Sequence, residues 1–343
     1  MKKFSLPTMF TLTLVIVGLM VSSAFSQEDE QEKRAQTGMK FLSFSVDARA
    51  AALGNAMTAD DQGSAASMFY NPASMARLNS TVGVVLGMTQ WIADINYNAA
   101  GVTFRPSGGL YGVFGLSLLS VDYGDITETI RSDVEAGYED VGTFSPSALA
   151  IGVGYAHALT DQFSVGGNVK YVKEDLGKSV MRFDDNDNLE REDNIQSTVA
   201  FDFGVLYHTG FRSLNFAMSA RNFSRDLTYA EETFELPLSF RIGIGMDLID
   251  FTGMDRDMHS FLLSIDTERP RDFDEMIRVG GEYLFMNTLA VRGGYAFPTD
   301  EQGINFGVGV QRGFGNLGLH IDYAYTQFGV FDNVNRVALQ LSF

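Results

Sequence analysis

Few residues in this chain have the types and spacing that catalysis or metal binding requires. The four histidines lie far apart, and none belongs to an HxxxH or HExxH spacing that would direct two imidazoles at one zinc ion. The chain has no cysteine, which excludes disulfides, Cys-ligated zinc, iron–sulfur clusters and thiol catalysis. No G-x-S-x-G sequence supplies a serine nucleophile. We therefore expect no enzyme, no metal site and no cofactor.

The run Asp184-Asp185-Asn186-Asp187-Asn188 has the composition of a calcium-binding loop. Such a loop places a glycine directly after these residues and a bidentate glutamate further on. Leu189 and Ile195 occupy those two positions here. We therefore interpret the run as a solvated loop.

The charge of the chain excludes a further class of function. It has 25 lysines and arginines against 43 aspartates and glutamates, for a formal net charge of -18. Because phosphate binding needs clustered basic residues, we expect no nucleic-acid partner. Hydrophobic residues make up 45% of the chain, with 28 Phe and 13 Tyr, which is enough apolar material for a large folded body.

The first residues have the pattern of an export signal. Lys2 and Lys3 precede an apolar stretch at about 9–21, and small residues stand just before Gln27. This predicts a signal peptide over residues 1–26, cleaved after about Ser26. A membrane anchor is the alternative, but the apolar stretch is shorter than the roughly 20 residues that cross a bilayer. No later stretch of 18 apolar residues exists, so the mature chain is either soluble outside the inner membrane or crosses a membrane as strands.

From about residue 80 onward, apolar residues alternate with a period of two. Val199, Phe201 and Phe203 share one face, while Ala200 and Asp202 share the other. The second face of such segments carries Gly, Ser, Asn and isolated charges, unlike the solvent face of a soluble sandwich. The pattern predicts a barrel wall with lipid outside and a polar lumen inside.

Fourteen segments alternate in this way, which predicts an all-β transmembrane barrel of about 14 antiparallel strands over residues 80–343. The segments are 80–90, 93–105, 110–122, 146–159, 162–175, 196–209, 213–223, 236–249, 259–268, 275–286, 288–298, 303–312, 316–327 and 332–343. Long polar connections mostly alternate with tight ones, as external loops and periplasmic turns should. The alternation fails between the first two segments and at 250–258.

The C-terminal segment 337–343 alternates and ends in Phe343. It resembles the terminal strand of outer-membrane proteins that the barrel assembly machinery recognises. We therefore assign Phe343 as an assembly signal, and we expect that machinery and outer-membrane lipid as partners.

Residues 27–79 differ from the alternating segments. An acidic leader is followed by alanine-rich, partly helical sequence that contains Phe41, Phe44 and Leu53. Wall side chains alone cannot fill so wide a barrel. We therefore expect a periplasmic leader and a lumen plug over 27–79, whose three large apolar residues bury against one another. A periplasmic tail is the alternative, and it suits the leader better than the apolar residues.

One part of this segment has a distinctive pattern: Asp47-Ala48-Arg49-Ala50, Gly54, Asp60-Asp61 and Asn71-Pro72-Ala73. It resembles the N-terminal pattern of the PorV/PorQ family of outer-membrane proteins. Asn55 and Tyr70 stand where Gly and Trp are usual in that family. The resemblance implies a FadL-like barrel with an N-terminal plug in the cell outer membrane.

Seven residues of the pattern are our candidates for docking the plug: Asp47, Arg49, Gly54, Asp60, Asp61, Asn71 and Pro72. Asp47 and Arg49 are two residues apart, which puts both on one side of a strand or loop, where each can pair with a lumen charge. The candidate wall partners are Arg221, Arg241, Arg278, Arg292, Asp202, Asp247 and Glu282. Asn71-Pro72 is a turn signal.

The resemblance also implies a function. It indicates a non-enzymatic accessory of type IX protein secretion, which binds secretion cargo domains and passes them to surface attachment proteins. A FadL-like importer of hydrophobic small molecules is the main alternative, and a porin-like protein without a dedicated substrate is a third. Fold similarity cannot choose among them. We favour the accessory because the detailed match is to PorV/PorQ.

Overall fold

The computed structural model describes residues 36–183, 189–229, 232–299 and 301–343. The expected signal peptide, its cleavage site and the leader up to residue 35 lie outside the described residues, as does the acidic run at 184–188.

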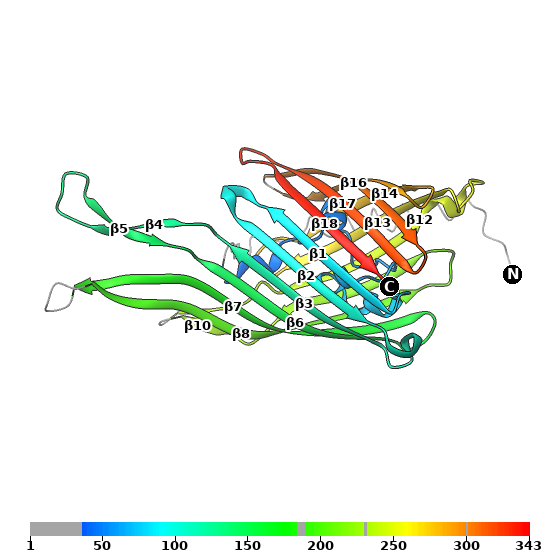
Figure 1. Cartoon of the computed structure of the whole chain (residues 1–343), viewed down its shortest axis with the longest axis horizontal. Helices are drawn as coiled ribbons and strands as arrows, with labels where there is room; N and C mark the ends of the chain where they lie inside the picture. The colour runs from blue at the N-terminus through cyan, green and yellow to red at the C-terminus, as the bar shows by residue number, and fades with distance from the viewer. Residues whose placement is uncertain (1–35, 184–188, 230–231, 300) are drawn as a thin grey trace, which may run out of the picture. The chain divides into compact units, whose positions relative to one another are not determined.

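Fourteen strands of the described chain close into one antiparallel barrel, as the alternation predicted (Figure 1). They are β1 (Val82–Gln90), β2 (Asn96–Phe104), β3 (Val113–Asp122), β6 (Ser147–Ala158), β7 (Phe163–Phe183), β8 (Leu189–His208), β9 (Asn215–Phe223), β12 (Ser239–Asp247), β13 (His259–Pro270), β14 (Met276–Phe285), β15 (Leu289–Phe297), β16 (Gln302–Phe314), β17 (Leu317–Phe328) and β18 (Val334–Ser342). The first and last of these strands pair with each other and close the barrel.

Two further hairpins lie outside the barrel sheet. They are β4 (Ile126–Arg131) with β5 (Tyr138–Phe144), and β10 (Leu227–Tyr229) with β11 (Glu232–Phe234). β7 and β8 also continue past the wall, because β6 pairs with β7 only as far as Asp175. These hairpins mark one end of the barrel, at the left in Figure 1. We call it the hairpin end, and the opposite end the turn end.

The remaining elements are short helices. They are η1 (Lys40–Ser43), α2 (Ala48–Ala52), η2 (Ala65–Phe69), η3 (Pro72–Arg77), η4 (Ile92–Asp94), η5 (Pro106–Gly109) and η6 (Leu248–Phe251). Within the described residues, no helix has the length and apolar composition needed to cross a membrane. η4 and η6 occupy the two connections that broke the expected alternation of loop lengths.

The two faces of the wall follow the sequence pattern. Val199 and Phe203 are 45% and 55% exposed, whereas Ala200 and Asp202 are 0% and 1% exposed. The large apolar side chains therefore point away from the interior, and the small and polar ones point into it.

One expected strand is shorter than its alternation suggested. The segment 236–249 becomes a strand only at Ser239, and Leu236 is fully buried rather than facing outward. Pro237 explains the difference, because it has no N–H to donate to a strand ladder. Leu236 instead packs in the interior at the hairpin end.

Phe343 extends the seam at which the barrel closes. Its carbonyl accepts hydrogen bonds from the N–H groups of Thr81 and Val82 at 2.6 and 3.2 Å, and its own N–H donates to Val82 at 2.9 Å. Its role as an assembly signal stays a prediction.

Candidate functional site

The segment 37–79, called the plug below, runs through the barrel from the hairpin end to the turn end. Near its start, Lys40 forms a 2.6 Å ion pair with Asp272 in the β13–β14 connection. Near its end, Nη1 of Arg77 donates to the carbonyl of Asp161, between β6 and β7, at 2.9 Å. The plug therefore contacts the wall along the length of the lumen.

Glycines on the inner face of the wall make room for the plug backbone. A Cβ atom on Gly280 would lie 2.8 Å from that of Leu53, and one on Gly294 would overlap Leu53 and Gly54. The same relation recurs at other inner positions: Gly87 with Val46, Gly166 with Pro72, Gly204 with Asn71 and Gly307 with Ala52. These separations are shorter than van der Waals contact allows. Such wall positions therefore accept no side chain while the plug is in place.

Arg49 is the charged centre of the plug. Its Nε and Nη2 donate to the two carboxylate oxygens of Glu282 on β14 at 2.9 and 3.0 Å, and its Nη1 donates to Asp60 at 3.0 Å. Arg292 on β15 also donates to Glu282, and it binds Asp322 on β17 at 2.6 Å. All of these side chains are buried. Because a two-point guanidinium–carboxylate pair fixes direction as well as distance, Arg49 sets the position of the plug against β14.

A second buried group surrounds Glu268 on β13. Arg241 and Arg278 donate to it at 2.7 and 2.6 Å. The same arginines reach the plug, where Arg241 donates to the carbonyl of Asn55 and Arg278 to that of Gly54, each at 3.2 Å. These two candidate wall partners thus bind plug carbonyls, whereas the sequence had suggested plug carboxylates.

Asp47 is the N-cap of α2 and makes no ion pair among the described residues. Its Oδ2 accepts from the N–H of Ala50 at 3.1 Å, while its Oδ1 is buried without a hydrogen-bond partner. Burial raises the pKa of Asp47 to about 6, and the Asp322 carboxylate adds to the rise. Residues two apart share a side in a strand or loop, but on a helix they do not face each other. Asp47 and Arg49, at the start of α2, therefore do not share a side.

Asn71 and Pro72 join the plug to β8. Asn71 Oδ1 caps η3 by accepting from the N–H of Ala73 at 3.1 Å, and Pro72 occupies the first turn of that helix. Asn71 Nδ2 donates to the carbonyls of Thr58 at 2.8 Å and Val205 at 3.1 Å. One amide therefore connects two parts of the plug with the wall.

The other candidates have separate partners. Asp61 accepts a 2.8 Å hydrogen bond from Asn215 on β9. Gly54 has φ +63, and a Cβ there would lie 2.9 Å from the backbone nitrogen of Tyr295.

The remaining wall candidates have the following partners: Arg221 donates to the Leu42 carbonyl at 3.4 Å, Asp202 pairs with Lys170 at 2.8 Å, and Asp247 caps η6 through the N–H of Ile249 at 2.9 Å. Asp202 and Asp247 thus have partners outside the plug.

An apolar cluster fills the lumen near the hairpin end. Met39, Phe41 and Leu42 are 2%, 1% and 4% exposed. Phe44 packs on the same cluster, which also includes Tyr97, Leu119, Val121 and Val172 of the wall and Leu236 of the connection before β12. Leu53 lies in a different cluster, with Ala50, Met57 and Tyr70. The expectation that Leu53 packs with Phe41 and Phe44 is wrong, because Leu53 lies against Gly280 of β14 and Gly294 of β15.

Sequence reasoning missed two plug residues. Thr58 donates from its N–H and hydroxyl to Asp266 on β13 at 3.0 and 2.7 Å. The hydroxyl of Tyr70 lies 2.8 Å from that of Ser45 and accepts from the N–H of Asp47 at 3.2 Å. The alternation in 259–268 was a signal for Asp266 as an inward carboxylate. Nothing in the sequence singled out Thr58.

A family model described as "Type IX secretion system protein PorV" matches residues 26–250. The chain belongs to the PorV family. It is therefore an outer-membrane β-barrel associated with type IX secretion, and the resemblance found in the sequence is confirmed. No curated protein matches the chain.

Solved structures share the barrel of this PorV-family chain. The CymD monoaromatic hydrocarbon channel has a TM-score of 0.56 at 12% identity, covering 90% of this chain and 99% of that one. The toluene transporter TodX of Pseudomonas putida has a TM-score of 0.57 at 12% identity, covering 86% and 96%. At such identities the likeness shows the fold alone.

The hairpin end is the second distinctive region of this PorV-family barrel. Nη1 of Arg191 on β8 donates to both carboxylate oxygens of Glu128 on β4, at 2.8 and 2.9 Å. This pair connects the β4–β5 hairpin with the β7–β8 hairpin. Ile126, Tyr138 and Ile195 are 44%, 55% and 42% exposed. The acidic residues between strands β3 and β6 are Asp125, Glu128, Asp133, Glu135, Glu139 and Asp140, against the single basic Arg131.

Proposed function

We propose that this PorV-family barrel is a non-enzymatic accessory of type IX secretion, which binds secretion cargo domains at its hairpin end and passes them to surface attachment proteins. The observation that carries the proposal is the contrast between a filled lumen and projecting hairpins. The plug contacts the wall from Lys40 to Arg77, so the barrel offers a protein-sized cargo a surface rather than a passage.

The hairpins suit such a docking role. β4 and β5 form a two-stranded sheet of their own, and β7 and β8 pair with each other beyond the wall (Figure 1). Strands with unpaired edges bind extended segments through main-chain hydrogen bonds, while neighbouring side chains supply specificity. The Arg191–Glu128 pair holds the two hairpins in a fixed relation.

Affinity purification of the tagged full-length protein from its native host tests the proposal. We expect proteins with secretion cargo domains to co-purify. A variant with residues 126–144 replaced by a short Gly-Ser turn should lose them, whereas the control, with 252–257 shortened at the turn end, should retain them. Both variants must keep heat-dependent gel mobility, which reports a folded barrel. Equal cargo recovery from the two variants contradicts docking on the hairpins, and no cargo on the unmodified protein contradicts the function itself.

Import of hydrophobic small molecules is the alternative. A solved channel for monoaromatic hydrocarbons and a toluene transporter share the fold, at 12% identity each. In this chain, however, Met39, Phe41 and Leu42 already occupy the apolar interior at the hairpin end. Recovery of a bound hydrophobic small molecule together with no protein partner would favour the importer.

A further inference from the structure

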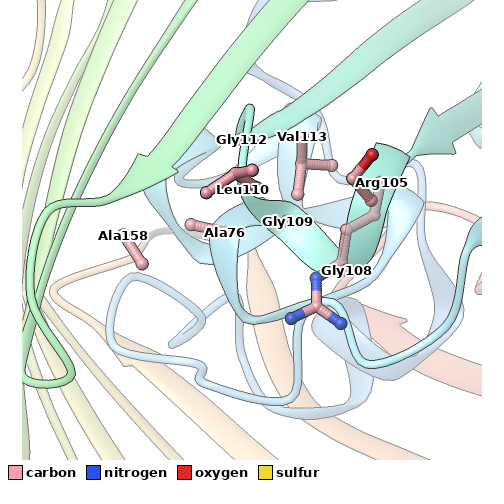
Figure 2. Close-up of a pocket in the computed structure, with 9 residues that line it drawn as sticks. Ala76, Arg105, Gly108, Gly109, Leu110, Gly112, Val113 and Ala158 are labelled. Carbon is pink, nitrogen blue, oxygen red and sulfur yellow. The ribbon is translucent and has the colours of Figure 1, made fainter.

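A cavity of about 350 Å³ lies at the turn end, away from the Arg49 ion network. It is lined by the β2–β3 connection together with Ala76 of η3 and Ala158 of β6 (Figure 2). Val113, which is buried against the plug residues Met68 and Met75, forms part of its apolar lining. The cavity therefore lies between the rim of the wall and the end of the plug.

Among the described residues, Arg105 is the only charged one that lines this cavity. Its Nε is buried and has no hydrogen-bond partner within the described chain. Its Nη1 reaches the carbonyl of Asn79 only at 3.4 Å. A guanidinium has five N–H donors in a planar fork, which matches the oxygens of phosphate or carboxylate. Arg105 thus supplies N–H donors for an anionic group, and none of the described residues that line the cavity is a carboxylate that would compete for them.

The β2–β3 connection is shaped around this guanidinium. A Cβ atom on Gly109 would lie 2.7 Å from Arg105 Nε, and Gly109 has φ +90. Glycine at this position lets the arginine lie against the backbone. Ser107, with φ 50, adopts the left-handed region without being glycine, a strained conformation that is concentrated at functional sites.

Apolar surface beside the cavity indicates the rest of the ligand. Leu110, which lines the cavity, is 70% exposed, and Tyr111 is 61% exposed. Phe104 and Phe114, at the ends of β2 and β3, are 48% and 47% exposed on the outward face. Aromatic residues at strand ends mark the boundary between membrane and water. A ligand that joins an anionic group to acyl chains matches both surfaces, whereas a soluble anion matches only Arg105.

We propose that this cavity binds the phosphate of a phospholipid in the periplasmic leaflet. Arg105 contacts the phosphate, and Leu110 contacts the first part of the acyl chains. The turn end faces the periplasm because long connections of outer-membrane barrels are external and short ones periplasmic. Basic residues that border the membrane bind lipid head groups in this way.

The test uses the full-length protein in detergent with three probes, namely dihexanoyl-phosphatidylglycerol, inorganic phosphate and dihexanoylglycerol, and follows binding by native mass spectrometry. We expect the phospholipid to bind most tightly. Arg105→Gln should weaken it about tenfold, and Arg105→Lys should weaken it less. The control Arg312→Gln changes an arginine near Phe314 at the same end, outside the cavity, and should bind like the unmodified protein.

Each contrary outcome removes a defined part of the proposal. Equal losses in Arg105→Gln and Arg312→Gln would overturn the role of Arg105. Inorganic phosphate binding as tightly as the phospholipid would overturn the lipid assignment, and dihexanoylglycerol binding as tightly would overturn phosphate recognition. Unchanged heat-dependent gel mobility in all variants separates a lost ligand from a lost fold.

Discussion

Arg49 of the plug and Glu282 of β14 face each other through two hydrogen bonds of 2.9 and 3.0 Å, although they are 233 residues apart in the sequence. Both side chains are buried. Burial removes the water that would otherwise solvate each charge. The two charges compensate each other for this loss, together with Asp60 and Arg292.

Arg49→Leu should lower the free energy of unfolding by about 3–5 kcal/mol, because it leaves buried carboxylates without their shared cation. Urea unfolding followed by gel mobility measures the loss. The double variant Arg49→Leu/Glu282→Gln should recover part of it. Lys178→Ala is the control, since its ion pair with Asp193 is 57% and 59% exposed and contributes at most about 1 kcal/mol. A similar loss from both single variants would contradict the role of Arg49.

Gly294→Ala and Gly293→Ala form a matched pair on β15. A Cβ on Gly294 would overlap Leu53 and Gly54 of the plug, whereas the nearest atom to a Cβ on Gly293 is 4.0 Å away. We expect Gly294→Ala to destabilise by about 1–3 kcal/mol through overpacking and Gly293→Ala to have a much smaller effect. Limited proteolysis of the plug in folded barrels checks this, and equal protection in the two variants would argue against tight docking.

Asp47 makes stability depend on pH. Its pKa is about 6 in the folded chain, above its ordinary value of 3.8, so the folded state holds the proton more tightly. The contribution of Asp47 to the free energy of unfolding is highest below about pH 4 and falls as pH rises to about 6. Asp47→Asn keeps a good N-cap and removes the charge. The variant should gain stability over the unmodified protein between pH 4 and pH 7.5, by at most about 3 kcal/mol. Parallel unfolding profiles of the two proteins across this range would contradict the assignment.

Deleting residues 37–79 should open the lumen, because fourteen strands enclose more space than wall side chains fill. The full-length protein should show little steady conductance in planar bilayers, and the deletion variant a large, stable one. The experiment requires that the variant still assembles, which heat-dependent gel mobility shows. A large steady conductance of the intact protein would refute the plug.

Phe203→Arg tests the orientation of the wall. Phe203 is 55% exposed on the outward face, and a cation at the bilayer midplane on such a face costs about 2–4 kcal/mol. Folded yield should fall well below that of Phe203→Leu, which keeps the position apolar. Gly204→Ala is not a neutral inward control, since a Cβ there would overlap Asn71. Equal yields of the two Phe203 variants would mean that the faces are reversed.

The sequence predicted the plug as a segment better than it predicted its contacts. Alanines at 48–52 and apolar residues at 39–44 distinguish this segment from the wall without reference to any partner. The docking of Asp47 could not be predicted in this way. Its two-residue spacing from Arg49 puts both side chains on one side of a strand but on different sides of a helix. Leu53 was placed wrongly for a similar reason, since the turn at Gly54, with φ +63, directs the chain against β14 and β15.

Alternation in the sequence predicted a barrel of about 14 strands and, apart from Leu236, the outward face of the strands that we compared. This was possible because period-two alternation is a local property set by the pleat of a strand. The sequence also determined that the chain has material for a plug. Which charges meet, which inner glycines receive the plug and where Arg105 borders a cavity depend on contacts that form only in the folded barrel. Those contacts join residues as distant as Arg49 and Glu282, and their pairing depends on how the strands are staggered when the barrel closes around the plug.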